Sequence, residues 1–104
     1  MEKKKIYISG PMRGIELLNG PAFNAAGVML DALDFEPVDP SLFALPTSAI
    51  LLDDEDWLVI DRIILKKCDA IFMLPGWQES EGASLEWADA VELGLPVYGF
   101  DLEA

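Results

Sequence analysis

One glutamate, Glu86, occupies a position at which a carboxylate can do chemistry. It lies three residues after Ala83 and four before Ala90, on the flank of the apolar stripe of a helix that Ser80 is suited to cap, while Asp89 falls on the far side. Burial disfavours the charged form of a carboxyl group, so a half-buried glutamate is expected to have a raised pKa unless a partner keeps it ionised. Such residues are candidates for catalysis, although this helix alone is equally consistent with a surface glutamate.

The residue types that are absent restrict the possible chemistry. The chain has no histidine and one cysteine, Cys68, which is expected to be a small core residue. Ser–His and Cys–His nucleophile pairs and most zinc sites are therefore excluded, and an internal disulfide is impossible. Catalysis must use carboxylates, hydroxyls, tyrosine, lysine or arginine, and we expect neither a metal nor a cofactor. The acidic run from Asp53 to Asp56 is expected to be the solvated first turn of a helix.

The overall composition indicates one small, acidic domain, which we expect to span residues 1–104. Of the 104 residues, 52% are hydrophobic, which argues against disorder. The formal net charge of -12 arises from 19 acidic and 7 basic residues, so no nucleic acid polymer is expected as a partner, because such binding depends on phosphate neutralisation. No apolar stretch approaches the ~20 residues that span a bilayer, and the Lys-rich start leads into a strand. We therefore expect a cytoplasmic protein that does not bind membranes.

Strands alternate with helices along the chain. The strands are expected at Lys5 to Ser9, Phe35 to Val38, Ala70 to Leu74 and Pro96 to Phe100. The helices are expected to begin at Gly20-Pro21 with Asn19 as the cap, at the acidic run, and near Gly82, and the last of them is expected to end at Leu93. This alternation predicts an α/β fold of three layers, with a short, doubly wound (flavodoxin- or Rossmann-like) parallel sheet in the strand order 2-1-3-4.

In this strand order the first and third strands are neighbours, and the helices that follow them lie on opposite faces of the sheet. Open α/β sheets bind their ligands in the crevice at the carboxyl ends of two such strands. The loops after these strands meet at that crevice. The topology therefore brings Tyr7, Arg13, Ser80 and Glu86 towards one pocket.

Three segments of the chain resemble the nucleoside 2-deoxyribosyltransferase superfamily, which includes the 2′-deoxynucleoside 5′-phosphate N-hydrolases. Residues 7–14 match the opening strand and glycine loop of these enzymes, Asp61 followed by Leu65, Cys68, Asp69 and Ala70 matches their aspartate-bearing helix, and Ser80, Gly82, Ala83 and Glu86 match the segment that ends in the catalytic glutamate. The similarity covers nearly the whole chain and is strongest to small phage and bacterial relatives of the DUF4406 type.

The resemblance implies cleavage of the N-glycosidic bond of a 2′-deoxynucleoside or its 5′-monophosphate, by hydrolysis or by transfer. Glu86 would be the nucleophile that attacks the anomeric carbon, Tyr7 would hold its carboxylate, and Asp61 would act near the leaving base. Cleavage of this bond passes through an oxocarbenium-like state, which a carboxylate below the sugar stabilises and can trap covalently. For Asp61, an ordinary exposed helix acid is the alternative.

The resemblance also implies a cradle for the sugar or its phosphate. It would consist of Ser9, Gly10, Pro11, Arg13 and Gly14 in the first loop, and of Ser80 and Gly82 at the start of the third helix. An exposed arginine in a turn is the alternative for Arg13. Transferases that act on free nucleosides often carry an aspartate where this chain has Glu81, which leaves the contact with the sugar 5′-hydroxyl open.

Other functions remain open from the sequence. A protein of this fold can bind or sequester a nucleotide without catalysis, and residues 42–52, rich in large apolar side chains, can serve as an interaction surface. Pairing of this segment between two copies would bury it, so we expect a homodimer or a larger assembly. A lid that packs on its own sheet is the alternative.

Overall fold

The computed structural model describes residues 2–12, 15–42 and 53–100. The strands are β1 (Lys5–Ser9), β2 (Glu36–Val38), β3 (Ala70–Met73) and β4 (Val97–Gly99). The α-helices are α1 (Gly20–Ala32), α2 (Asp54–Leu65) and α3 (Glu81–Leu93), and the short 3-10 helices are η1 (Glu16–Asn19), η2 (Pro40–Leu42) and η3 (Trp77–Glu79). Every strand and helix that the sequence predicts is present close to its expected bounds.

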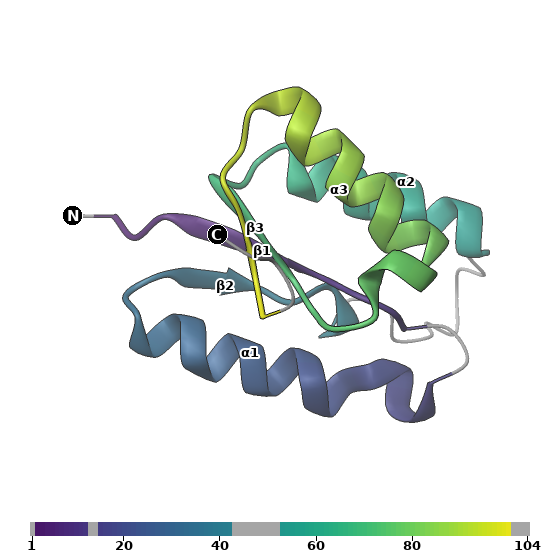
Figure 1. Ribbon diagram of the computed structural model, residues 1–104, viewed down its shortest axis with the longest axis horizontal. Helices are drawn as coiled ribbons and strands as arrows, with labels where there is room; N and C mark the ends of the chain where they lie inside the picture. The colour runs from purple at the N-terminus through teal and green to yellow at the C-terminus, as the bar shows by residue number, and fades with distance from the viewer. Residues whose placement is uncertain (1, 13–14, 43–52, 101–104) are drawn as a thin grey trace, which may run out of the picture.

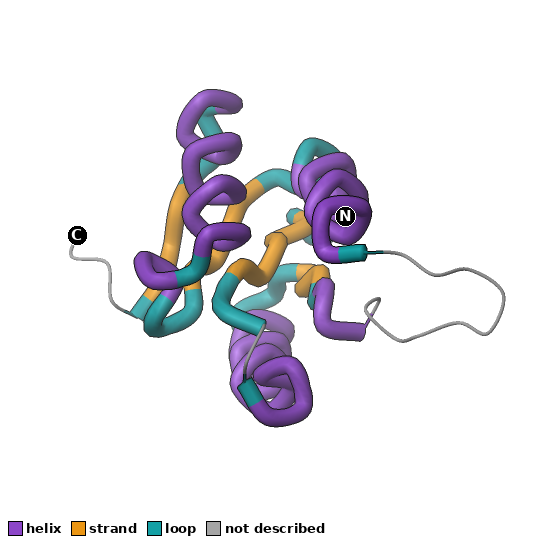
Figure 2. The backbone as a smooth tube through the Cα atoms, turned by 90° about the vertical axis from the view of Figure 1, so that its right-hand side faces the viewer, coloured by secondary structure: helices purple, strands orange, loops and turns teal. Residues whose placement is uncertain are grey.

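The sheet has the predicted topology. Its strands are parallel and pair in the order β2-β1-β3-β4, with Tyr7 opposite Ile71 and Ser9 opposite Met73 across the central pair. α1 covers one face of the sheet, and α2 and α3 cover the other (Figure 1). Figure 2 shows the same three layers from the side. The helices that follow β1 and β3 thus lie on opposite faces, which creates the predicted switch point between these strands.

Alternate residues of β1 contribute to two separate hydrophobic cores. Ile6 and Ile8 pack with buried side chains of α1, whereas Tyr7 belongs to the core that β3 forms with α2 and α3. Successive side chains of a strand point to opposite faces, so Ser9 shares the face of Tyr7. The strand is buried from Ile6 to Ser9. A polar group on the Tyr7 face must therefore find its hydrogen-bond partner inside the protein.

Two helix starts show how local polar contacts set the chain direction. The Asp56 N–H donates to the Asp53 carboxylate at 2.8 Å, and the Asp53 N–H donates to the Asp56 carboxylate at 3.1 Å, so the acidic run is a capping box on the exposed first turn of α2. Asn19 departs from the prediction, because its side chain does not cap α1. Its amide instead donates to the carbonyl of Pro11 at 2.9 Å, which ties the loop after β1 to the start of α1.

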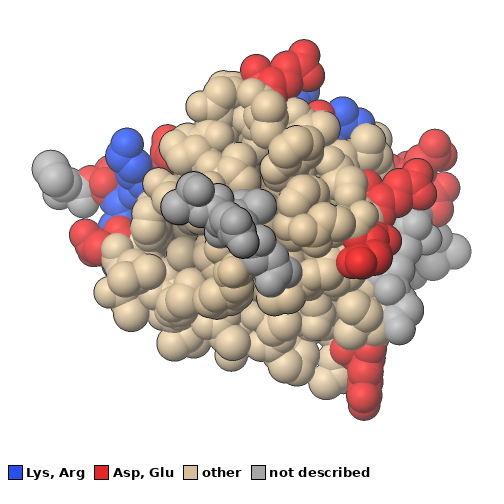
Figure 3. All heavy atoms as spheres, viewed as in Figure 1, with Lys and Arg blue, Asp and Glu red and all other residues tan. Residues whose placement is uncertain are grey.

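Charged side chains lie around the rim of the face that Figure 1 views, and the described side chains in the middle of that face are uncharged (Figure 3). Apolar side chains are also exposed near the edge strand β4, where Tyr98 and Phe100 are accessible. The segment on which the homodimer was predicted begins with the exposed Leu42, and the remainder of it, residues 43–52, lies outside the described residues.

β1 ends in a close contact with the chain that leaves β3, and this contact requires glycine. A Cβ atom on Gly10 would lie 2.7 Å from the Cβ of Leu74 and 2.9 Å from its Cδ1. Leu74 is buried, and its N–H donates to the carbonyl of Ser9 at 2.8 Å. Leu74 therefore cannot move aside without disturbing the end of β1.

We expect Gly10→Ala to lower the free energy of unfolding by about 1–3 kcal/mol, because the added methyl group overpacks this contact. Gly20→Ala is the matched control. A Cβ at Gly20, the first residue of α1, meets nothing within 4 Å, so this change should cost nothing or stabilise by about 0.4–1 kcal/mol. Urea denaturation measures both variants, and equal midpoints would contradict the close contact at Gly10.

Candidate active site

Glu86 is buried between α3 and the central strand β1. Glu86 is only 6% exposed to solvent. The hydroxyl of Tyr7 donates to Oε2 of Glu86 at 2.7 Å, and the hydroxyl of Ser9 donates to Oε1 at 2.7 Å. Both donors come from one face of β1, two residues apart, so the strand presents them as a pair to the two carboxylate oxygens. A surface glutamate, the alternative from sequence, is thereby excluded.

Opposing effects act on the ionisation of Glu86. Burial raises the pKa of this carboxyl group above its ordinary value, and it is the largest effect. The hydrogen bonds from Ser9 and Tyr7 oppose it because they favour the charged form, and the net shift is upward. The two hydroxyls thus replace part of the water that burial removes from the carboxylate.

Tyr7 serves as a neutral donor. Its pKa is raised far above the ordinary value, first by burial and then by the negative charge of Glu86. The phenol therefore keeps its proton throughout the physiological pH range, and the hydrogen bond to Glu86 persists whenever the carboxylate is ionised.

Asp61 of α2 is the second buried acid at this place. It too is only 6% exposed, which excludes the alternative of an ordinary exposed helix acid. Burial and the charge of Glu86 raise the pKa of Asp61 from 3.8 to about 7. A carboxyl group whose pKa lies this near neutrality can both bind and release a proton there.

The start of α3 has a structural explanation that is independent of any ligand. Ser80 accepts a hydrogen bond from the Ala83 N–H at 3.2 Å and caps the helix, as predicted. Gly82 follows in the first turn. Trp77 of η3 is buried and stacks on Trp87, with ring centroids 5.5 Å apart, so it is a packing residue. Ligand contacts by Ser80 and Gly82 stay predictions.

The first loop is described only in part. Gly10 is packed against Leu74, and Pro11 is tied to Asn19 through its carbonyl oxygen. Arg13 and Gly14, the predicted phosphate-binding residues, lie outside the described residues. The structure thus brings Tyr7, Ser9 and Glu86 into direct contact and places Asp61 near enough for the charge of Glu86 to affect it.

Sequence reasoning missed an ion pair beside these acids. The guanidinium of Arg62 donates to the carboxylate of Asp89 through Nε at 2.6 Å and through Nη2 at 2.9 Å. The expectation that Asp89 faces away from the protein was wrong, because α2 lies against α3 on that side and supplies a cation. In the sequence, Arg62 directly follows Asp61 and Asp89 lies three residues after Glu86. These positions indicate an ion pair only once α2 and α3 are known to pack against each other.

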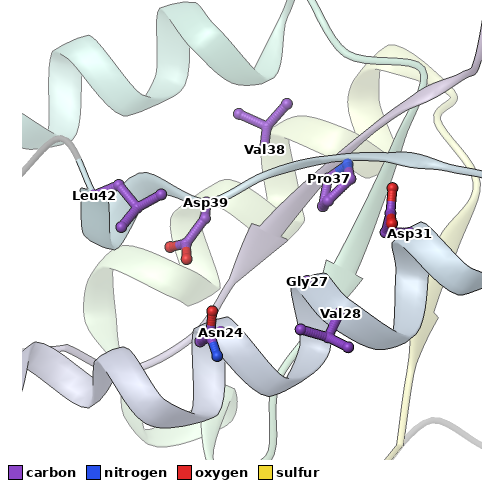
Figure 4. Close-up of a pocket in the computed structure, with 8 residues that line it drawn as sticks. All are labelled: Asn24, Gly27, Val28, Asp31, Pro37, Val38, Asp39 and Leu42. Atoms are coloured by element: carbon purple, nitrogen blue, oxygen red, sulfur yellow. The ribbon is translucent and has the colours of Figure 1, made fainter.

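No metal-binding cluster is found in the described ranges: no three or more of their Cys, Asp and Glu side chains are grouped to hold an ion. A pocket of 420 Å³ lies elsewhere, and its lining includes Asn24, Val28 and Asp31 of α1 and Val38, Asp39 and Leu42 after it (Figure 4). None of the predicted site residues lines this pocket.

The family model described as a domain of unknown function, DUF4406, matches residues 4–99. The chain belongs to this DUF4406 family. Among solved structures, the fold is similar to that of a 2-desoxiribosyltransferase from Leishmania mexicana, with a TM-score of 0.67 and 22% sequence identity over 93% of this chain. The chain spans 63% of the length of that protein. A comparison with curated proteins finds no match. In the described part of this DUF4406 protein, no helix is long and apolar enough to cross a membrane.

The stability of this DUF4406 protein is expected to depend on pH through Asp61. Between its ordinary pKa of 3.8 and its folded pKa of about 7, the folded protein retains a proton that the unfolded chain has released. The contribution of protonated Asp61 to the free energy of unfolding is therefore fully present below pH 3.8 and is lost as the pH rises through about 7.

The side chain introduced by Asp61→Asn cannot ionise, so this variant should show a weaker dependence of stability on pH between 3.8 and about 7. Glu55→Gln, at an exposed acid of the same helix, should keep the dependence of the wild type. Urea midpoints measured across this pH range provide the comparison. Identical slopes for the wild type and Asp61→Asn would show that Asp61 is not the titrating group.

Proposed function

We propose that this protein cleaves the N-glycosidic bond of a 2′-deoxynucleoside or its 5′-monophosphate, with Glu86 as the nucleophile. The observation that carries the proposal is the buried Glu86 carboxylate, which accepts hydrogen bonds of 2.7 Å from Tyr7 and from Ser9. A second buried acid, Asp61, lies near enough for the charge of Glu86 to raise its pKa. The fold similarity to a 2-desoxiribosyltransferase adds support.

The first step forms a covalent intermediate. A carboxylate offers about four lone-pair sites, so each oxygen of Glu86 retains one after it accepts the bond from Tyr7 or Ser9. One of these oxygens attacks the anomeric carbon and forms a C–O bond, while the bond from that carbon to the base nitrogen breaks and its electron pair leaves with the base. The carboxyl proton of Asp61 passes to the departing base, which leaves as a neutral molecule.

The second step releases the sugar. Water, or the nitrogen of an acceptor base, attacks the anomeric carbon, and the C–O bond to Glu86 breaks with its electron pair returning to the carboxylate. The proton of the attacking group passes to Asp61, which restores the acid for the next turnover. Tyr7 and Ser9 donate hydrogen bonds to the carboxylate as it is regenerated. The two hydroxyls therefore stabilise Glu86 as a leaving group in this step and orient it for attack in the first.

The sugar or its phosphate would lie over the loop after β1 and the start of α3, with Ser9, Gly10, Pro11, Arg13, Gly14, Ser80 and Gly82 as the proposed contacts. Backbone N–H groups in the first turn of α3 suit a phosphate or a sugar hydroxyl, and an arginine adds a charge-assisted bond. The homodimer expected from residues 42–52 remains a prediction, as does the cytoplasmic location.

The decisive experiment incubates the protein with a panel of 2′-deoxynucleosides and their 5′-monophosphates, with and without an acceptor base, and follows free base by chromatography. Base release without an acceptor indicates hydrolysis, and base exchange indicates transfer. Binding of a panel member without release of its base would favour a non-catalytic nucleotide-binding module instead.

Glu86→Gln should abolish turnover and leave the fold and ligand binding nearly intact, because the amide keeps the shape of the side chain but is not a nucleophile. Asp61→Asn should slow turnover by about 10²–10⁴-fold, the usual contribution of a general acid. Glu92→Gln, at an exposed acid of α3, is the matched control and should retain activity. Base release by Glu86→Gln within about tenfold of the wild type would exclude Glu86 as the nucleophile, since loss of a covalent nucleophile costs far more.

Arg13→Ala should weaken the binding of a 2′-deoxynucleoside 5′-monophosphate roughly 10- to 100-fold more than that of the matching nucleoside, because a charge-assisted hydrogen bond contributes about 1.5–3 kcal/mol. Calorimetry in a Glu86→Gln background measures both ligands without turnover. Lys66→Ala, at an exposed lysine after α2, is the control for a general loss of positive charge. An equal loss for both ligands would mean that Arg13 does not recognise the phosphate.

A further inference from the structure

The ion pair between Arg62 and Asp89 joins the two helices that carry the buried acids. Arg62 directly follows Asp61 on α2, and Asp89 lies three residues after Glu86 on α3. The two hydrogen bonds of the ion pair, of 2.6 and 2.9 Å, form the bidentate geometry in which a guanidinium and a carboxylate fix each other's orientation. The other ion pairs among the described residues join Lys3 to Asp31 in the last turn of α1 and to Asp34 just after that helix.

The pair is suited to hold the acids at a constant separation. Asp61 and Glu86 come from different helices, so their relative position depends on how α2 and α3 pack. Residues three apart on a helix are neighbours on its surface, which puts Asp89 within one turn of Glu86 on α3. A two-point contact between the residue after Asp61 and the residue one turn beyond Glu86 restricts both sliding and rotation of the helices at this level.

The pair also adds opposite charges beside Glu86. The groups around Glu86 are Tyr7 and Ser9 of β1, Asp61 and Arg62 of α2, and Asp89 of α3. Asp89 raises the pKa of Glu86 and Arg62 lowers it, so each compensates for the other. The side chain of Asp89 is only 14% exposed while that of Arg62 is 43% exposed, so solvent screens the cation more than the anion.

We propose that Arg62 and Asp89 are positioning residues, which hold the carboxyl groups of Asp61 and Glu86 side by side and balance the charge around Glu86. Neither residue contacts the reacting atoms. The consequence for turnover rests on the proposed function, but the effect on the two carboxyl groups is a property of the free protein.

The first test is a carbon-13 NMR titration of the Glu86 and Asp61 carboxyl groups in the ligand-free protein. Arg62→Gln leaves the charge of Asp89 uncompensated, so the pKa of Glu86 should rise. Asp89→Asn leaves the charge of Arg62 uncompensated, so the pKa of Glu86 should fall. The double variant should return close to the wild type, because both charges are gone. Lys66→Gln, at an exposed cation just after α2, is the control and should leave the titration unchanged.

Shifts of opposite sign separate this role from simple packing, which would move Glu86 in the same direction in both single variants. Shifts of the same sign, or no shift in either variant, would overturn the proposal. If Asp89→Asn does not fold, the comparison of Arg62→Gln with Arg62→Lys decides. Only the first removes the positive charge, so the pKa of Glu86 should rise in Arg62→Gln and stay near the wild type in Arg62→Lys.

The second test uses turnover, if the wild type releases base. The acid limb of the kcat profile, which follows ionisation of Glu86, should move to higher pH in Arg62→Gln and to lower pH in Asp89→Asn. Arg62→Lys should keep the position of this limb but have a reduced kcat, since lysine supplies the charge without the two-point contact. A wild type that releases no base would reject the proposed function, while the titration would still decide the role of the pair.

Discussion

The structure around the candidate site depends on the two hydrogen bonds that the hydroxyls of Tyr7 and Ser9 donate to the buried Glu86 carboxylate. A carboxylate taken out of water without partners would take up a proton or prevent the helix from docking. Two donors, one for each oxygen, make its burial tolerable. They can act together because β1 is regular and central, so that alternate side chains project from the same face towards the same helix.

The two buried acids differ in their surroundings, and the proposed function gives them different tasks. Burial raises the pKa of both acids, but Glu86 has two hydrogen-bond donors that oppose this shift, whereas the charge of Glu86 adds to it at Asp61, whose pKa is raised to about 7. Pairs of carboxyl groups whose environments separate their pKa values are the usual basis of acid and nucleophile roles. A chain without histidine thereby acquires, from a buried aspartate, a group that titrates near neutral pH.

The arrangement of layers explains why the acids gather on one side. Of the α-helices that the structure describes, only α1 covers the first face of the sheet, and the core on this face is formed by apolar side chains such as Ile8 and Phe23. The other face receives two helices, and a place between two helices and a strand is where side chains from three elements converge. Gly10 permits the close approach of the chain segments that follow β1 and β3, at the carboxyl end of these two strands.

Much of the fold and part of the site could be predicted from the sequence, because they depend on local signals. Apolar runs ended by Gly and Pro predicted the strands, Ser80 predicted the start of α3, and the strand and helix alternation predicted the order of the sheet. That order alone placed Tyr7 and Glu86 at the same switch point. The sequence by itself therefore determined the topology and which loops meet, since both follow from short-range periodicity and the handedness of crossovers.

Only the tertiary structure decided how deeply Glu86 is buried, that Ser9 is its second donor, and that Asp89 pairs with Arg62. Helical spacing placed Glu86 at the boundary between the core and solvent. The orientation of α3 against β1 decides that its side chain is buried. The partners of Asp89 and Glu86 are 27 and 77 or more residues away in the chain. Contacts of this kind depend on how rigid elements pack in three dimensions, and no pattern within one helix or strand encodes that packing.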